Sequence, residues 1–419
     1  MQLVGALGTG GAMTRILLAA AVALALSPGL GAAQRASQDS SPRIAAAVNG
    51  AIVLFRSDGG GRTALTRGGL DSSPVVSPDG SLIAFLRTPV VPPPQPGMPG
   101  PPMQQVMLAS PNGQHGYDIT VFSQRFFLSS LRQAIAWEPG GHAPGLAWYD
   151  GNTVQYRRAS GNQRTVLQVG PASPTDGTGS ITFASDDTTI AAPAAPPHAG
   201  ATPARTLRIA VSHFNGGQRI ITVHFRSGIL SNGDPHRGSV PVGDGLTYTD
   251  SRFPSRLHTL EFPTVAMGAG YQVTGLFLVS DRGGTARMAL GNGHGVHGVP
   301  PFGPTLEGAT HFQYAPNRKY IATDPNNSLW ISGQVARPFR IPIPHAGSCV
   351  LAQWTWLSDS SGLAYVTTCT VGGSNPLRYR LTLGTVSLKG GKPAVLDTIE
   401  SRNPQAIDLA PAYRCVGCG

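Results

Sequence analysis

The chain alternates short apolar runs with turns rich in Gly, Pro, Asp and Ser. The clearest case is residues 75–85, where an apolar run enters the turn at 78–80 and a second apolar run leaves it. Proline sets φ for a tight turn, and glycine accepts the positive φ that follows. Two further apolar runs lie upstream at 52–55 and 63–66. We therefore predict a unit of four antiparallel strands.

Weaker copies of this unit follow along the chain. Aligned on the proline position of the turn, the six copies fall at residues 78, 139, 185, 241, 316 and 358. The intervals scatter around the roughly 40–50 residues of a propeller blade, and loop insertions account for the longer ones. The other half of the unit recurs at 276–284, at 328–332 and, more loosely, at 381–387. A half-blade near the C-terminus is what ring closure requires, because it pairs the two chain ends.

These repeats predict an all-β fold. We expect a six-bladed β-propeller of four-stranded antiparallel blades over residues 46–411, with seven blades as the alternative count. The alternative fold is a β-sandwich whose turns look alike by chance. Six copies at blade-like spacing favour the propeller over that alternative.

The same residues resemble the TolB-like β-propeller repeat, the WD40-like or PD40 repeat, which also occurs in propeller domains of prolyl oligopeptidase-like enzymes. The match is close over 52–85 and looser over most of 46–400. The resemblance implies a six-bladed ring that commonly works in protein–protein interaction. We expect neither the separate N-terminal domain of TolB nor the α/β-hydrolase domain of the peptidases, so the resemblance supports the fold more than the role.

The N-terminus has the pattern of an export signal. Arg15 supplies a positive charge, residues 16–26 form an apolar core, and small residues precede a cleavage site before Gln34. We therefore expect a signal peptide over 1–33, whose true start could be Met13, and a linker over 34–45. An uncleaved membrane-anchoring helix is the alternative. No later run reaches about 18 apolar residues, so we expect a secreted, periplasmic or cell-envelope protein with no stable membrane span after cleavage.

The amino-acid composition and net charge exclude some classes of protein and partner. The 419 residues include 54 Gly and 37 Pro but only 12% charged residues, which excludes a coiled coil. The net charge of +10 could attract nucleic acid, yet the arginines are scattered and no basic run of five or more occurs. We therefore expect no nucleic-acid partner.

All four cysteines lie near the C-terminus, at Cys349, Cys369, Cys415 and Cys418. In an exported chain disulfides are the default state, and four cysteines allow three pairings. Cys349 begins one predicted strand and Cys369 ends the next, so antiparallel pairing would bring them close together. Cys415 and Cys418 lie in the tail 412–419. There we expect a disulfide, either local or fixing the tail to the rest of the chain, rather than a metal-binding or redox pair.

Catalytic motifs are absent from the sequence. It contains no Gly-x-Ser-x-Gly elbow, no P-loop and no His-Glu-x-x-His motif. His294 and His297 are candidate metal ligands. They are weak candidates, because no acidic residue lies near them in sequence to complete a site. The acidic residues Asp58 and Asp281 fall at equivalent turns, where we expect them to cap backbone N–H groups. We predict no cofactor, no metal site and no catalytic residue.

Two further features concern binding and packing. Eight prolines crowd residues 89–102, and we predict an exposed, polyproline-like loop that could dock a partner: Pro89, Pro92, Pro93, Pro94, Pro96, Pro99, Pro101 and Pro102. Four tryptophans occupy strand positions that would face the core between blades: Trp137, Trp148, Trp354 and Trp356.

The sequence thus favours an exported, monomeric, non-catalytic propeller that binds a protein or peptide partner through loops at one face of the ring. The alternative is an extracytoplasmic propeller enzyme, a metal-dependent hydrolase or lyase, with its site in the central channel.

Overall fold

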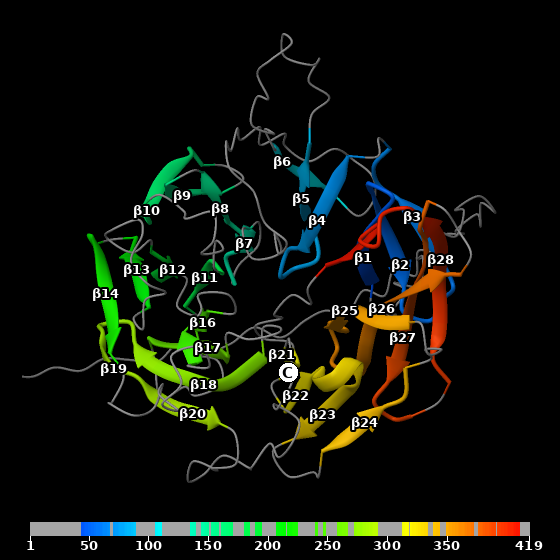
Figure 1. Cartoon of the computed structure of the whole chain (residues 1–419). Helices are drawn as coiled ribbons and strands as arrows, with labels where there is room; N and C mark the ends of the chain where they lie inside the picture. Colours follow the sequence, from blue (N-terminus) through cyan, green and yellow to red (C-terminus); the bar gives the residue numbers. More distant parts are fainter. Residues whose placement is uncertain are drawn as a thin grey trace, which may run out of the picture. The chain divides into compact units, whose positions relative to one another are not determined.

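The computed structural model describes most of the repeat region. Its described residues are 43–67, 70–88, 105–110, 135–139, 144–150, 152–158, 161–170, 180–184, 189–194, 207–214, 216–224, 239–241, 246–248, 258–266, 272–291, 312–317, 319–333, 338–343, 349–372, 376–390 and 392–410. All of them belong to one unit, Ser41–Gly419. Within it the strands form seven sheets, arranged as the blades of a propeller (Figure 1).

We number the blades from the N-terminus and give their strands in spatial order, starting at the inner strand. Blade 1 is β29 (Ile407–Leu409), β1 (Arg43–Val48), β2 (Ala51–Arg56) and β3 (Arg62–Ala64). Blade 2 is β4 (Asp71–Val76), β5 (Ile83–Arg87) and β6 (Gln105–Ala109). Blade 3 is β7 (Ile135–Trp137), β8 (Leu146–Asp150), β9 (Thr153–Arg157) and β10 (Arg164–Gln168).

Blades 4 and 5 are joined by strand β19, which lies between β18 and β20 of blade 5 in the sequence but pairs with β14 of blade 4. Blade 4 is β11 (Thr182–Phe183), β12 (Thr189–Pro193), β13 (Arg208–His213) and β14 (Gln218–His224), with β19 (Gly284–Thr285) parallel to β14. Blade 5 is β15 (Ser239–Pro241) and β16 (Thr247–Tyr248), then β17 (Thr259–Ala266), β18 (Gln272–Ser280) and β20 (Arg287–Gly291).

The last two blades have four strands each. Blade 6 is β21 (Phe312–Tyr314), β22 (Tyr320–Thr323), β23 (Leu329–Gly333) and β24 (Phe339–Ile341), with the 3-10 helix η4 (Pro325–Asn327) between β22 and β23. Blade 7 is β25 (Cys349–Trp356), β26 (Gly362–Val371), β27 (Arg378–Ser387) and β28 (Ala394–Ser401).

The β-propeller prediction is confirmed, and the blade count is seven. The predicted repeat unit spans two blades: β2 and β3 are the outer strands of blade 1, and β4 and β5 are the first two strands of blade 2. Strand β1, at 43–48, begins inside the segment that we expected to be a linker. The Asn49-Gly50 turn that joins β1 to β2 has positive φ at both residues, as a two-residue hairpin requires.

The ring closes through the two ends of the described chain. Strand β29 pairs antiparallel with β1, joining Ala46 to Leu409 and Val48 to Ile407. The half-unit at 381–387 lies instead in β27 of blade 7. The inner strand of blade 1 therefore comes from the C-terminal end of the described chain, and no copy of the turn lies in this blade.

The copy centred on Pro241 was interpreted wrongly. The apolar runs on either side of that position were expected to form a hairpin, but β15 and β16 both pair with β17. They are two pieces of one inner strand, since Val240 pairs with Val265 and Tyr248 pairs with Leu260.

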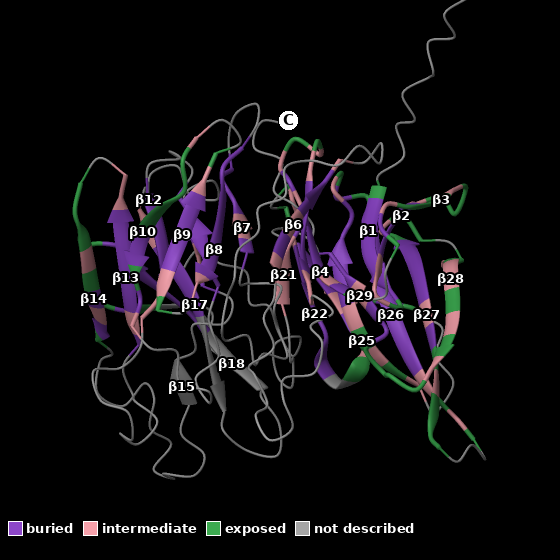
Figure 2. Cartoon of the chain, turned by 90° about the horizontal axis from the view of Figure 1, so that it is seen from above, coloured by how far each residue is buried: buried purple, intermediate pink, exposed green. Residues whose placement is uncertain are grey.

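Apolar side chains pack between neighbouring blades, and the strands that carry them are drawn largely as buried in Figure 2. Among the described residues, six clusters join blades 1 and 2, 2 and 3, 3 and 4, 4 and 5, 6 and 7, and 7 and 1. Trp137 and Trp148 lie between blades 2 and 3, and Trp354 and Trp356 lie between blades 6 and 7. All four are buried, so their predicted packing role is confirmed.

Candidate functional site

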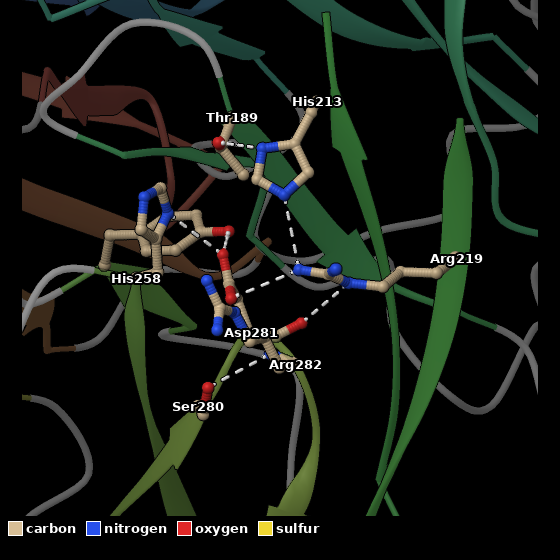
Figure 3. A network of polar contacts seen from close by, with 8 residues as sticks. Thr189, His213, Arg219, His258, Ser280, Asp281 and Arg282 are labelled. Carbon is tan, nitrogen blue, oxygen red and sulfur yellow. Dashed lines mark hydrogen bonds and ion pairs between the residues drawn. The ribbon is translucent and has the colours of Figure 1, made fainter. Parts of the chain in front are cut away.

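A buried carboxylate forms the centre of a polar network between blades 4 and 5 (Figure 3). Asp281 follows β18, and its side chain is only 1% exposed. Its Oδ1 lies 3.2 Å from Nη2 of Arg219, and its Oδ2 lies 3.1 Å from Nδ1 of His258. The hydroxyl of Tyr248 donates to Oδ2 at 3.4 Å. Blade 4 supplies the arginine, whereas blade 5 supplies the other three residues.

The turn that carries Asp281 lies against the outer strand of blade 4. Nε of Arg219 donates to the main-chain oxygen of Asp281 at 3.0 Å. Just beyond, the parallel pairing of β19 with β14 joins Val223 to Gly284. Gly284 has a φ of +121°, a conformation that side-chain-bearing residues rarely adopt. The network thus links blade 4 to blade 5.

His213 extends the network within blade 4. Its Nε2 lies 3.3 Å from Nη2 of Arg219, and its Nδ1 lies 2.7 Å from Oγ1 of Thr189. The imidazole therefore lies between Thr189 and the guanidinium that contacts Asp281.

His258 combines an unusual backbone with partial exposure. Its φ is +60°, in the left-handed region, and its main-chain oxygen accepts a bond from the N–H of Asp281 at 2.8 Å. Its side chain is 28% exposed. Strained backbone near a buried carboxylate is a recurring feature of functional sites.

Burial dominates the electrostatics of Asp281. It raises the pKa of the carboxyl, and the nearby His258, Arg219 and His213, together with the Tyr248 hydrogen bond, oppose that shift without cancelling it. The carboxylate itself is inaccessible, whereas the side chains of Arg219 and His258 that contact it are 38% and 28% exposed. The arrangement can orient an imidazole, and its direct structural effect is to join two blades.

A second region with unusual features is the end of blade 7, which we call the blade-7 extension and define as residues 349–351, 367–372 and 376–381. Strands β26 and β27 have 10 residues each, against five in β8 and β9 of blade 3. The disulfide between Cys349 and Cys369 joins β25 to β26 here. Val350 is 47% exposed and Leu377 is 49% exposed. The lower end of blade 7 is accordingly drawn partly as exposed in Figure 2.

The predicted site residues have different outcomes. The expected proximity of Cys349 and Cys369 is confirmed by their disulfide. Asp58 caps the N–H of Gly60 at 2.8 Å, as expected. The expectation that Asp281 caps its own turn is wrong, because its buried carboxylate contacts Arg219, His258 and Tyr248 instead. His294, His297, Cys415, Cys418 and the eight prolines of the loop 89–102 lie outside the described residues.

Sequence reasoning did not find the partners of Asp281. Arg219, His213 and His258 carry no shared motif and come from separate strands, so no spacing signal could have joined them. The part of the chain that the structure describes contains no group of three or more His, Cys, Asp or Glu able to hold a metal ion. Nor does that part contain a helix long and apolar enough to cross a membrane.

No protein-family model and no curated protein matches the chain. Solved structures similar to it include the C-terminal WD40 domain of Sif2, at 10% identity over 83% of this chain and 78% of that chain, with a TM-score of 0.41. A TolB candidate from Agrobacterium tumefaciens is 9% identical over 89% of this chain and 100% of that one, with a TM-score of 0.34. Hydrazine synthase from Kuenenia stuttgartiensis is 10% identical over 75% and 86%, with a TM-score of 0.43. Membership of the TolB-like family stays a prediction.

Proposed function

We propose that the chain is an extracytoplasmic β-propeller scaffold that binds a protein or peptide partner through the blade-7 extension. The observation that carries this proposal is the exposure of Val350, in β25, and of Leu377, directly before β27, at the end of a blade whose strands β26 and β27 have 10 residues each. Large apolar side chains that stay exposed on a rigid element are typical of interaction surfaces.

The rigidity of the blade-7 extension supports the same proposal. The Cys349–Cys369 disulfide and the pairing of β26 with β27 through Val371 and Arg378 hold the extension in one conformation. A preorganised surface loses less conformational entropy when a partner binds.

An extracytoplasmic location is supported by two features. Disulfides persist in oxidising compartments, and the structure contains one. The N-terminal sequence has the charge, apolar core and small residues of a cleavable export signal. Cell fractionation followed by N-terminal sequencing of the purified protein tests this part, and we expect Gln34 as the first residue of the mature chain.

Partner capture tests the binding function. The full-length chain, tagged at its C-terminus, is expressed in the organism that encodes it and recovered from the envelope fraction after mild cross-linking. The informative variant combines Val350→Ser with Leu377→Ser, which removes the two exposed apolar groups. The matched control is Val395→Ser, because Val395 is 59% exposed on the outer strand of the same blade.

We expect one dominant protein with the wild type and the control, and at least about a fivefold loss with the double variant. Equal recovery with the double variant would contradict the assignment of the surface. A chain lacking residues 89–102 is tested beside it: a loss confined to that chain would assign binding to the Pro-rich loop instead. Recovery of no specific protein by any chain would overturn the scaffold function.

A further inference from the structure

The three lysines of the chain lie in adjoining turns at one end of blades 6 and 7. The sequence contains 31 Lys and Arg residues, and its lysines are Lys319, Lys389 and Lys392. Lys319 lies in the turn 315–319 after β21, whereas Lys389 and Lys392 lie in the turn 388–393 after β27. All three side chains are exposed, and we call them the lysine cluster.

Hydrogen bonds join these two turns through a third one, the turn 357–361 after β25. The N–H of Asn317 donates to Oγ of Ser360 at 2.9 Å. The N–H of Leu388 donates to the main-chain oxygen of Ser361, also at 2.9 Å. The three turns therefore form one continuous surface across two neighbouring blades.

The charge of this surface is positive. Asp359 is the one acidic side chain among the described residues of the three turns, and its Oδ1 accepts a hydrogen bond from the N–H of Ser361 at 2.9 Å. In the described part of the chain the three ammonium groups form no ion pair. On the adjacent blade 1, Arg62 pairs with Asp397 at 3.3 Å, so these two residues add no net charge.

The lysine cluster lies at the end of the ring where the described chain begins. Oγ1 of Thr385, near the end of β27, donates to the main-chain oxygen of Ser57 at 2.9 Å, so the turn after β2 adjoins the end of β27. Arg43, the first residue of β1, lies opposite Arg56, the last residue of β2. The export signal that we predict at 1–33 is therefore joined to the ring at this same end.

We infer that the lysine cluster binds the anionic headgroups of a phospholipid membrane. Before cleavage, the nine residues 34–42 would keep this end of the ring within about 30 Å of the membrane, their fully extended length. Lysine carries a hydrated point charge on a flexible stem, which suits a fluid layer of phosphate groups, whereas fixed two-pronged recognition favours arginine. Basic side chains close to an anionic leaflet are attracted to it additively. After cleavage the cluster would keep the protein at the membrane surface.

This surface is separate from the blade-7 extension. Neighbouring antiparallel strands run in opposite directions, so the connection between β26 and β27 lies at the other end of the blade from the turn after β27. In Figure 2, β1 begins at the upper edge of the ring, and the extension lies at its lower edge. A ring held by the lysine cluster would therefore present the extension away from the membrane.

Co-sedimentation with vesicles tests the inference. The exported protein is mixed with vesicles made of phosphatidylglycerol and phosphatidylcholine in equal parts. Vesicles of phosphatidylcholine alone measure binding by any leader that the protein retains.

Two variants lose the same charge at different places. The informative variant combines Lys319→Gln, Lys389→Gln and Lys392→Gln. The matched control changes three exposed arginines outside the cluster: Arg67→Gln, Arg340→Gln and Arg402→Gln.

We expect the wild type and the control to bind the mixed vesicles, and the lysine variant to bind them at least about tenfold more weakly. Added salt should weaken binding, because it screens the attraction. Equal binding by the two variants, or equal binding of the wild type to both kinds of vesicle, would overturn the inference. So would binding to alginate, a soluble acidic polysaccharide, through the same lysines without binding to vesicles.

Discussion

Two aspartates at equivalent turns have opposite environments. Asp58 has a 45% exposed side chain and caps its own turn, whereas Asp281 is buried and contacts Arg219. The turn sequence predicts the first role and cannot predict the second, because the decisive guanidinium comes from the neighbouring blade. Burial by a distant segment thus changes what the same residue type does.

The raised pKa of Asp281 predicts the sign of a pH effect. Above its folded pKa the buried carboxylate is charged and costs desolvation energy, and protonation removes that cost. The stability of the wild type relative to Asp281→Asn should therefore increase as the pH falls through the raised pKa toward the ordinary value of 3.8. Urea unfolding of both proteins from about pH 7 to about pH 4 measures this difference. A difference that moves the other way would show that the ion pairs outweigh burial.

Gly145 is required by close packing in blade 3. The buried Glu138 accepts hydrogen bonds from the N–H of Gly145 and the hydroxyl of Tyr156, and it pairs with Arg158. Burial, followed by the bond to Glu138, raises the pKa of Tyr156 to about 12, so its hydroxyl stays a donor. A Cβ at residue 145 would collide with the Tyr156 ring.

We expect Gly145→Ala to lower the free energy of unfolding by about 1–3 kcal/mol, as overpacking does. Gly217→Ala is the control, because a Cβ there meets no atom within 4 Å. Chemical denaturation of the two variants measures the effect, and equal stability would mean that Tyr156 moves aside without cost.

At the scale of elements, turn residues predict that two strands adjacent in the sequence form a hairpin. They do not predict pairing with a strand further along the chain. The turn at 78–80 joins β4 to β5, and the predicted approach of Cys349 to Cys369 is realised in β25 and β26. The runs around Pro241 looked like the same hairpin but pair side by side with β17. Two short runs separated by a few polar residues are compatible with either arrangement, and only the partner strand distinguishes them.

The disulfide should stabilise the blade-7 extension more than the ring. It closes a loop of 20 residues, for which the chain-entropy model gives about 3 kcal/mol. We expect Cys349→Ser combined with Cys369→Ser to increase hydrogen exchange at 367–371 and 378–381. Residues 43–56 of blade 1 serve as the internal reference, since no covalent change occurs near them. Unchanged exchange in the extension would show that strand pairing alone keeps it ordered.

For the whole molecule, the inner half of blade 1, strands β29 and β1, is the part that local sequence could not predict. The repeat predicted a closed ring, but β29 at 407–409 is only three residues long. Its partner β1 lies at the other end of the described chain. Neither strand can be predicted without the other, so the sequence supported seven blades only as an alternative to six.

Closure of the ring should therefore depend on a few buried side chains. Leu409 is fully buried in the core between blades 7 and 1. Leu409→Ala should cost about 2–5 kcal/mol, the range for such a truncation in a packed core. Calorimetry measures it, with Val395→Ala, an exposed position on blade 7, as the control expected to stay near the wild type. A loss no larger than that of the control would show that β29 is not needed to hold the ring closed.

The pairing of β1 with β29 also sets an order of events during synthesis. The first described strand cannot find its partner until nearly the whole chain has left the ribosome, so blade 1 is the last sheet that can be completed. Until then β1 keeps an open edge and the ring stays unclosed. The export that we propose would be compatible with that delay, because the ring is completed only after the C-terminal residues of the described chain are available.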